Sequence, residues 1–360
     1  MWRLGVLLAF VVAIAVGYYS GLTAAQSRLV TPDEINNVEV RTRNIRGVVT
    51  IISKSAPEAV PQGEDPNIYS TGFFYSANRI ITNYHAVNND PVSVQVQLFD
   101  GRRFRAEIEA YDIGIDIAIL SVQGITAPAV LRFSSSAEVL PGQKAIVLGS
   151  PQRKPNNVAV GVVSGFNRIE EFPDEIGIEI PEMMLTDANI ESGNSGGPVL
   201  DSKGFVIGVV DANLESSLTA TGKIGLAIPA PLVQQSISDL ERFGVSQRGK
   251  LGAQLKDVSE LEPFVLREVG LNSNRGALVM AIDPSSAAAR AGLRASKLDR
   301  DGRISELGDV ILKVGSRDVQ GRYDVIQQVA KRRPGDTITL SVWRNRRPVE
   351  LKFVLNRVTQ

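Results

Sequence analysis

Short apolar runs separated by turn residues are the feature that most constrains how this chain folds. They recur between residue 38 and about residue 228, with no long helical pattern between them. Strands that alternate with long helices would indicate a parallel α/β sheet, whereas many short strands in succession indicate β-barrels or β-sandwiches. The clearest runs are Val48–Ile52, Arg79–Thr82, Val92–Val96, Ile117–Leu120, Ala145–Leu148 and Phe205–Val210.

One amphipathic helix is expected at the end of this region, over Ala230–Phe243, because Leu232, Val233, Ile237 and Leu240 share a face. The sequence therefore predicts a mainly β domain over residues 38–243. Polar residues between Gly244 and Gly249 then mark a domain boundary.

Residues 249–358 have a mixed pattern, which predicts a second, smaller α/β domain. The predicted strands are Ala277–Ile282, Asp309–Val314, Thr337–Trp343 and Val349–Leu355, and the predicted helices are Ser285–Ala291 and Tyr323–Arg332.

The N-terminal residues 1–25 have the pattern of a membrane-targeting segment. Arg3 precedes 22 uncharged residues, Leu4 to Ala25, and about 20 apolar residues are enough to cross a bilayer. Small residues at Thr23-Ala24-Ala25 also fit a signal-peptidase site. A transmembrane anchor and a cleaved signal peptide both remain open, and both place the rest of the chain outside the cytoplasm. Residues 26–37 are polar and are expected to form a linker.

Composition excludes several functions. The chain has 39 basic and 39 acidic residues, so no nucleic-acid partner is expected. It has no cysteine, which excludes disulfides and thiolate catalysis, and its one histidine excludes a histidine-rich metal site. We expect no metal and no cofactor, and any histidine chemistry must use His85.

Three segments together favour a hydrolase with a serine nucleophile. Thr82–Val87 contains His85, Asp112–Leu120 contains Asp116, and Asp187–Pro198 contains Ser195. A serine hydroxyl becomes a good nucleophile when an imidazole, oriented by a buried carboxylate, takes its proton. Glycines around Ser195 would let the main-chain N–H groups of Gly193 and Ser195 form an oxyanion hole.

These segments, Thr-Asn-x-His-Ala-Val, Asp-Ile-Ala-Ile-Leu and Gly-Asn-Ser-Gly-Gly-Pro, resemble the signatures of the HtrA (Deg) serine proteases. The resemblance implies a trypsin-like double β-barrel with His85 as general base, Asp116 as its orienting carboxylate and Ser195 as nucleophile. Asp112 is the competing carboxylate. The segment departs from the family at Glu191 and Ser192, where the family usually has Asn-Pro, and this leaves the preference of the substrate pocket open.

The second domain resembles a PDZ domain, which implies C-terminal peptides as partners. Arg248–Ala253 resembles the carboxylate-binding loop, in which the N–H groups near Leu251, Gly252 and Ala253 would hold a peptide C-terminus. Ile326 and Val329 are candidates for the second wall of the groove. The alternative is that these two residues only pack the core of the domain.

Further expectations concern specificity and regulation. Ile190, Val209 and Val210 should border a modest apolar substrate pocket, with Glu191 and Asp211 close in sequence. Arg168 falls where the family has a regulatory arginine, and its alternative is an exposed loop residue. The resemblance also implies a homotrimer.

The expected function is endoproteolysis of misfolded or regulatory extracytoplasmic proteins. The alternatives are a catalytically silent peptide-binding scaffold or chaperone and a non-peptidase hydrolase.

Overall fold

The structure, a computed structural model, describes residues 31–56, 65–88, 91–135, 139–150, 157–167, 180, 182–191, 193–215, 223–262, 266–267, 270–271, 273–300 and 303–357. In this part of the chain no helix has the length and apolar character needed to cross a membrane. The predicted targeting segment 1–25 and Arg168 lie outside the described residues.

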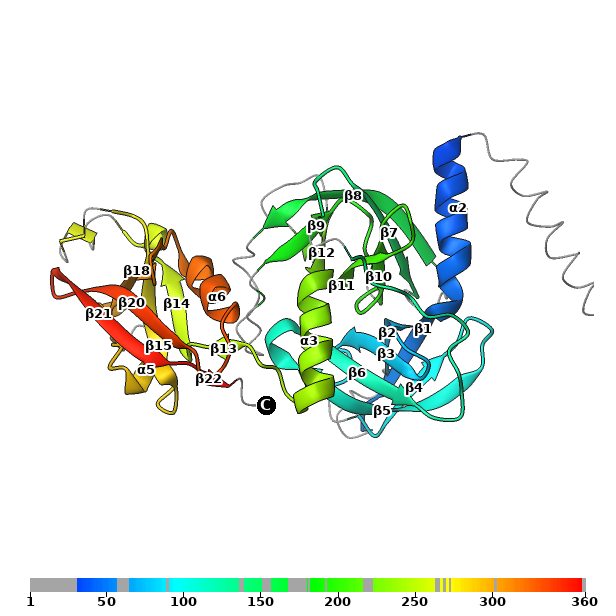
Figure 1. The fold of residues 1–360 in the computed structure, drawn as a ribbon, viewed down its shortest axis with the longest axis horizontal. Coiled ribbons are helices and arrows are strands. Elements are labelled where there is room, and N and C mark those ends of the chain that lie inside the picture. The colour runs from blue at the N-terminus through cyan, green and yellow to red at the C-terminus, as the bar shows by residue number, and fades with distance from the viewer. Residues whose placement is uncertain are drawn as a thin grey trace, which may run out of the picture.

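Two closed antiparallel barrels of six strands form the larger domain (Figure 1), which confirms the predicted double barrel. The first barrel has the order β1-β2-β3-β6-β5-β4. Its strands are β1 (Val48–Lys54), β2 (Asn67–Phe74), β3 (Arg79–Asn83), β4 (Ser93–Gln97), β5 (Arg103–Asp112) and β6 (Ile117–Val122).

The second barrel has the order β10-β11-β12-β9-β8-β7. Its strands are β7 (Lys144–Gly149), β8 (Asn157–Asn167), β9 (Met183–Thr186), β10 (Pro198–Leu200), β11 (Val206–Glu215) and β12 (Lys223–Pro229). Each of the six apolar runs predicted as strands coincides with a strand of the two barrels, although Val92 and Phe205 lie one residue before β4 and β11. The helix α3 (Ala230–Phe243) has the predicted bounds, and it ends at Gly244, whose φ of 71° suits glycine.

The largest core cluster spans both barrels. Phe73 and Ile117 of the first barrel pack in one cluster with Leu148, Leu200 and Ile228 of the second. Because burial of apolar area is the main stabilising term in folding, this shared core fixes the barrels against each other. Loops that leave the two barrels therefore hold their side chains in fixed positions relative to one another.

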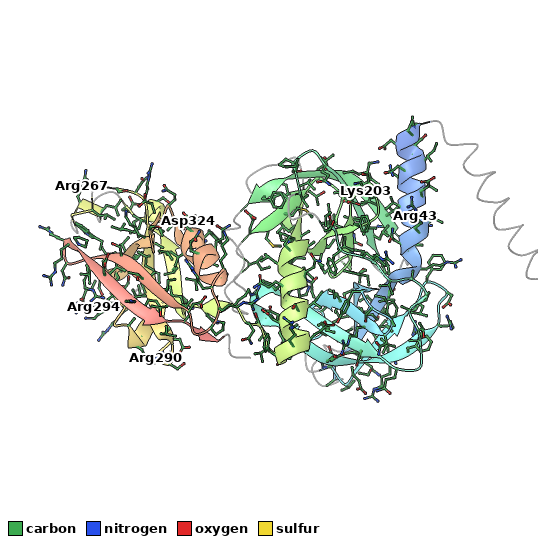
Figure 2. All side chains as sticks on the ribbon, in the orientation of Figure 1. Arg43, Lys203, Arg267, Arg290, Arg294 and Asp324 are labelled. Carbon is green, nitrogen blue, oxygen red and sulfur yellow. The ribbon has the colours of Figure 1, made fainter. Side chains whose placement is uncertain are left out.

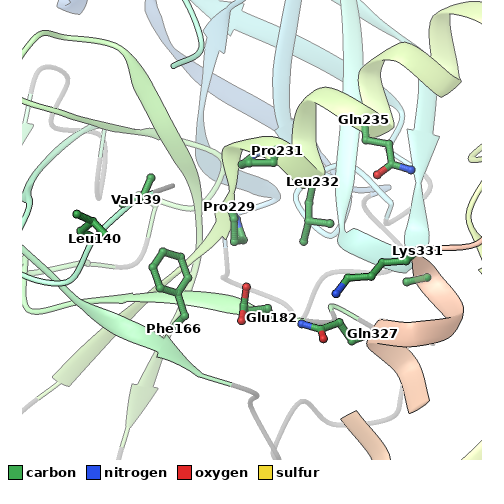
Figure 3. A pocket seen from close by; sticks show the side chains of 11 residues that line it. Val139, Leu140, Phe166, Glu182, Pro229, Pro231, Leu232, Gln235, Gln327 and Lys331 are labelled. Carbon is green, nitrogen blue, oxygen red and sulfur yellow. The ribbon is translucent and has the colours of Figure 1, made fainter. Parts of the chain in front are cut away.

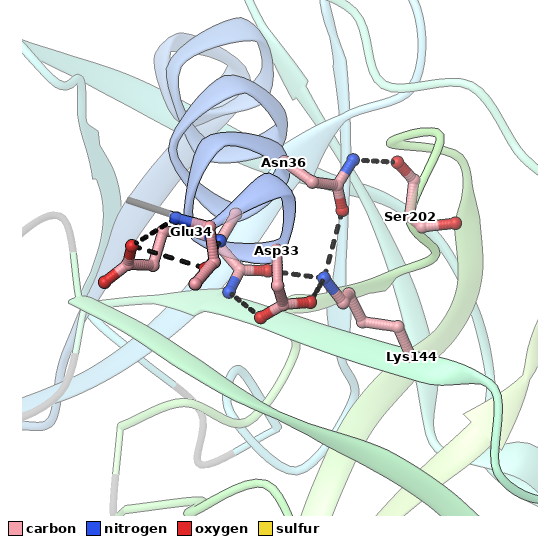
Figure 4. Close-up of polar contacts among 7 residues, drawn as sticks. Asp33, Glu34, Asn36, Lys144 and Ser202 are labelled. Carbon is pink, nitrogen blue, oxygen red and sulfur yellow. Dashed lines mark hydrogen bonds and ion pairs between the residues drawn. The ribbon is translucent and has the colours of Figure 1, made fainter. Parts of the chain in front are cut away.

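The expectation of a linker over residues 26–37 is wrong from Pro32 onward, where helix α2 (Pro32–Asn44) begins. Thr31 and Glu34 form a capping box, and proline stands in the first turn, so the helix start has its hydrogen bonds satisfied. Figure 4 shows how the helix is attached: Lys144 binds Asp33, Asn36 and Asn37. Asn36 also donates to the carbonyl of Ser202 at 2.7 Å, and the polar residues that indicated a linker are thus contacts to the second barrel.

The smaller domain consists of an antiparallel sheet with helices packed against it and has its own core. The sheet order is β14-β15-β18-β20-β21, with β19 paired to β18. These elements are β14 (Ala253–Asp257), β15 (Ala277–Ile282), β18 (Val310–Val314), β19 (Arg317–Asp318), β20 (Thr337–Arg344), β21 (Arg347–Val354), α5 (Ala287–Arg290) and α6 (Arg322–Ala330). Two short pairs accompany them, β13 (Gly249–Lys250) with β22 (Asn356–Arg357) and β16 (Lys297–Leu298) with β17 (Ile304–Glu306).

The four predicted strands and two predicted helices of this domain are all present, with small shifts at their ends. Helix α5 is shorter than predicted because Ser286 acts as its N-cap and accepts from the N–H of Ala289 at 3.1 Å. In Figure 2 the side chains of Arg290 and Arg294 lie at the periphery of this domain, as Arg43 does on α2.

The connection between the domains, which the sequence marks as a polar boundary, is buried from Ser246 to Gly249. Arg248 is 6% exposed and pairs with Asp112 at 2.5 Å, and Ser236 of α3 donates to the same carboxylate at 2.7 Å. Asp239 of α3 accepts from the N–H of Gln247 at 3.0 Å and from Arg333, beyond α6, at 2.7 Å. Charged contacts therefore hold the second domain against α3.

Candidate active site

His85 and Asp116 are brought together by the first barrel. His85 follows β3, and Asp116 stands between a short 3-10 helix (Ile113–Ile115) and β6. The Nδ1 atom of His85 lies 2.6 Å from Oδ2 of Asp116, and the main-chain N–H of His85 donates to Oδ1 at 2.8 Å. This carboxylate thus holds both the ring and the backbone of the histidine.

Asp116 is fully buried and has a left-handed backbone with φ of 54°, uncommon for a residue with a side chain. Its carbonyl accepts from the N–H of Tyr84 and from the side chain of Asn83, which offset the cost of this conformation. A strained, buried carboxylate held by several contacts is typical of a functional site. Asp112, the competing carboxylate, instead pairs with Arg248.

The environment of His85 makes the imidazole more basic than usual. Burial of the ring lowers its pKa, but the hydrogen bond to Asp116 and the negative charge of Asp116 outweigh this, so that the pKa is raised above 6.5. Since Nδ1 faces Asp116, a proton on Nδ1 leaves Nε2 as the acceptor of a proton from a nucleophile.

Ser195 lies on a tight glycine-containing turn before β10. Gly193 has φ of 94° and Gly196 has φ of 82°. A Cβ at Gly196 would lie 2.2 Å from the carbonyl oxygen of Thr71, so no other residue fits there. The side chain of Thr71 holds the turn in place because its hydroxyl donates to the carbonyl of Gly193 at 2.6 Å.

The hydroxyl of Ser195 donates to the main-chain carbonyl of Asp211 at 2.8 Å. No hydrogen bond joins this hydroxyl to His85 in the described part of the chain, so the serine is held away from the imidazole in this structure. Catalytic hydrogen bonds are often long or misaligned in enzymes without substrate. A change of the Ser195 side-chain rotamer would be needed to bring the hydroxyl to His85.

The three residues expected to border a substrate pocket are all buried. Val209 packs in the core shared by the barrels, and Val210 packs in the core of the second barrel. Ile190 is 3% exposed and lies in the same cluster as Val210, close to the backbone of Gly225. Val209 and Val210 point to different clusters because neighbouring side chains on a strand face opposite ways.

The predicted peptide-binding residues lie on one side of the second domain. Leu251 is buried, Gly252 has φ of 74° beside Ser286, and Ala253 begins β14. Strand β14 is an edge strand, and α6 packs near it. On α6, Ile326 is half-buried, whereas Val329 is 3% exposed and belongs to the core cluster of the domain.

A cavity of about 430 Å³ lies between the two domains (Figure 3). Leu232 and Gln235 of α3 and Phe166 of β8 face Gln327 and Lys331 of the second domain across it. This cavity is separate from His85 and Ser195, which do not line it.

Asp211 is the residue of the site that the sequence analysis missed, since it was noted only as close to the expected pocket. It is 3% exposed, and its Oδ1 lies 3.9 Å from Nδ1 of His85. The sequence signal for this residue is its position: Asp211 directly follows the apolar run Val206–Val210, and an ionised side chain is costly to bury in such a strand.

Comparisons with known families and proteins agree with this arrangement. The profile of the trypsin-like peptidase domain matches residues 70–209, and that of the PDZ domain matches residues 249–355. The chain is 30% identical to "Protease Do-like 1, chloroplastic" of Arabidopsis thaliana, over 93% of this chain and 75% of that protein. It is 31% identical to the putative serine protease HhoB of Synechocystis sp., over 81% of this chain and 67% of that protein.

Other relatives are longer. The chain is 28% identical to the periplasmic pH-dependent serine endoprotease DegQ of Escherichia coli, and it spans 58% of the length of DegQ. Among solved structures, that of the HtrA-type protease AlgW with a decapeptide is similar, with a TM-score of 0.69 and 25% identity, covering 90% of this chain and 99% of that chain.

Proposed function

Because the chain belongs to the HtrA (Deg) family of serine endoproteases, we propose that Ser195 is its nucleophile, His85 its general base and Asp116 the orienting carboxylate. The observation that carries this proposal is the 2.6 Å contact between His85 Nδ1 and the fully buried Asp116. A buried carboxylate in this position fixes the tautomer of the imidazole and stabilises the imidazolium that forms during catalysis.

The proposed reaction begins when the Ser195 hydroxyl leaves the carbonyl of Asp211 and turns toward Nε2 of His85. His85 takes the hydroxyl proton as the oxygen attacks the scissile carbonyl, and the main-chain N–H groups of Gly193 and Ser195 stabilise the oxyanion. His85 then gives the proton to the leaving amine, and water hydrolyses the acyl-enzyme by the same steps in reverse. Since Asp116 already holds His85, binding of substrate has only to reposition Ser195.

The substrate pocket proposed here is small and apolar, with Ile190 at its border, and it favours valine, alanine or leucine at the cleaved position. Asp211 does not supply a charge to this pocket because its carboxylate lies beside His85. Glu191 is exposed and stands two residues before Gly193. A cleavage profile dominated by lysine or arginine would assign the pocket to Glu191 and contradict this proposal.

The second domain is proposed to bind C-terminal peptides and to regulate the protease. The exposed edge of β14 offers main-chain groups to an added peptide strand, and the loop at Leu251, Gly252 and Ala253 offers N–H groups to its carboxylate. Structures of the related AlgW with a tripeptide and with a decapeptide support peptide binding. Ile326 on α6 is retained as a lining residue, and Arg168 is the proposed link between peptide binding and the catalytic loops.

We place the activity outside the cytoplasm, on misfolded or regulatory proteins. Relatives carry the names periplasmic serine endoprotease and chloroplastic protease, which supports an extracytoplasmic location. Residues 1–25 are proposed to act as a targeting segment, either an anchor or a cleaved signal, and the assembly is proposed to be a homotrimer.

Cleavage of denatured casein distinguishes a protease from a silent scaffold. Ser195→Ala should lower the rate by on the order of 10⁴-fold or more, because the members of a triad act as a unit. Ser202→Ala is the matched control, since this exposed serine contributes only its carbonyl to a contact with Asn36. No cleavage by the wild type would favour the scaffold, and equal cleavage by the wild type and Ser195→Ala would contradict the proposed role of Ser195.

A further inference from the structure

A β-bulge aims Asp211 into the active site. Strand β11 pairs with β12 through Val210 and Ala227 and then through Ala212 and Leu226, so Asp211 is an extra residue between two ladder positions. Bulges next to active sites often redirect a side chain in this way. The bulge turns the carbonyl of Asp211 to Ser195 and its carboxyl group to His85.

The site holds two buried carboxyl groups for one cation. Asp116 is 0% and Asp211 is 3% exposed, and one carboxyl oxygen from each lies within 4.8 Å of the other and of a ring nitrogen of His85. Among the described residues, Asp116 and His85 are the charged groups that act on Asp211. Two buried carboxylates this close do not both ionise readily.

The two carboxyl groups differ in the donors around them. Asp116 accepts from the ring and from the backbone of His85, which stabilise its charged form. In the described part of the chain Oδ2 of Asp211 is buried and has no hydrogen-bond partner. Burial, the largest cause, and the negative charge of Asp116 raise the pKa of Asp211 well above 3.8, although the charge of His85 opposes them. A proton in this pair therefore belongs on Asp211.

We infer that Asp211 is a positioning residue that stays protonated in the working enzyme and donates a hydrogen bond to the carboxylate of Asp116. This inference rests on the catalytic roles proposed above. A neutral Asp211 satisfies its own buried oxygen and holds Asp116 in its strained position. It also spares His85 a second adjacent negative charge, which would raise the pKa of the imidazole further and keep the general base protonated at neutral pH.

Two variants separate a hydrogen-bond donor from a charge. Asp211→Asn keeps a donor without any charge, and Asp211→Leu removes the donor at similar size. Glu107→Gln, which neutralises an exposed carboxylate on β5, is the control. The kcat, KM and pH dependence of kcat/KM on a peptide substrate are measured for the full chain, together with thermal unfolding to verify folding.

Asp211→Asn should keep nearly the wild-type kcat, and the acid limb of its pH profile of kcat/KM should be unchanged. Asp211→Leu should lose about tenfold to a hundredfold in kcat at constant KM, as for a lost hydrogen bond to a charged group. If Asp211→Asn moves the acid limb of kcat/KM to lower pH by about one unit or more, Asp211 is ionised in the wild type and the inference is wrong.

Infrared difference spectroscopy of the wild type against Asp211→Asn gives a readout that does not depend on proteolysis. The inference predicts the carbonyl stretch of a protonated carboxylic acid in the wild type at neutral pH and its loss in Asp211→Asn. Spectra without this difference would overturn the inference even in an active enzyme. A wild type that shows the band but cleaves nothing would contradict the proposed function and leave the protonation of Asp211 supported.

Discussion

The active site and the junction between the domains are both built around a buried aspartate from the same short segment, and they treat its charge in opposite ways. At the junction, Asp112 faces the buried guanidinium of Arg248, and Asp239 faces Arg333. At the active site, Asp116 and Asp211 share one histidine. The junction is therefore balanced in charge, and the active site has an excess of carboxyl groups.

This difference separates a structural from a functional use of buried charge. A paired buried ion costs desolvation but contributes hydrogen bonds that hold two elements together. An unbalanced cluster is costly to the fold and shifts the pKa of its members, which is useful only where protons move.

The largest effect is expected for Asp116→Asn. Loss of the carboxylate leaves His85 in the wrong tautomer and removes stabilisation of the imidazolium, so kcat should fall by about 10⁴-fold. Unfolding by denaturant, followed in parallel, should show that the variant is still folded. A kcat within tenfold of the wild type would exclude Asp116 as the orienting carboxylate.

The same substitution at the junction, Asp112→Asn, should lower the stability of the fold and leave kcat nearly unchanged. Arg248 would remain buried without an ionised partner, which typically costs about 3–5 kcal/mol of unfolding free energy. The kcat per folded molecule should stay close to the wild-type value because Asp112 does not contact His85. Calorimetry or urea unfolding measures the unfolding free energy. A rate assay normalised by active-site titration measures the kcat per folded molecule. A loss of kcat without a loss of stability would contradict the division between the two regions.

How far the sequence predicted these regions depends on whether a local signal existed. The proposed triad could be predicted because each member sits in a distinctive motif, and α3 was predicted correctly because its apolar face and Gly244 are adjacent in sequence. Helix α2 was missed because Asp33, Asn36 and Asn37 appeared to be solvated, although Thr31 and Glu34 already formed a capping pattern.

Other features depend on contacts between distant segments, which one sequence does not reveal. Nothing local indicates that Arg248 pairs with Asp112 across 136 positions, or that a bulge turns Asp211 toward His85. Val209 and Val210 were expected to border the substrate pocket, but strand alternation and the two barrel cores bury both side chains.

The pH dependence of the enzyme should follow the raised pKa of His85. The general base must be neutral, so kcat/KM should fall about tenfold per pH unit below this pKa, and the acid limb should lie above 6.5. Burial alone would lower the pKa of His85 and move the acid limb to lower pH, whereas the hydrogen bond and charge of Asp116 raise this pKa. An acid limb clearly below 6.5 would show that burial outweighs Asp116.

The smallest direct effect is expected for Arg333→Ala at the junction. The arginine side chain is 53% exposed, so its pair with Asp239 should contribute about 1 kcal/mol or less. Limited proteolysis should nevertheless cut the segment from Gly244 to Gly249 faster in this variant. Arg267→Ala, an exposed arginine of the same domain, serves as control. Equal cutting of both variants and the wild type would mean that Arg333 does not hold the domains together.

The most direct measurement of the catalytic site is covalent labelling with a fluorophosphonate, mapped by mass spectrometry of peptides from the full chain. Phosphonylation requires a serine that an adjacent base activates. The account predicts a single modified residue, Ser195, whose labelling is lost in His85→Ala and preserved in Asp112→Asn. Absence of label from the folded wild type, label on another serine, or labelling that persists in His85→Ala would contradict the assignment of His85, Asp116 and Ser195.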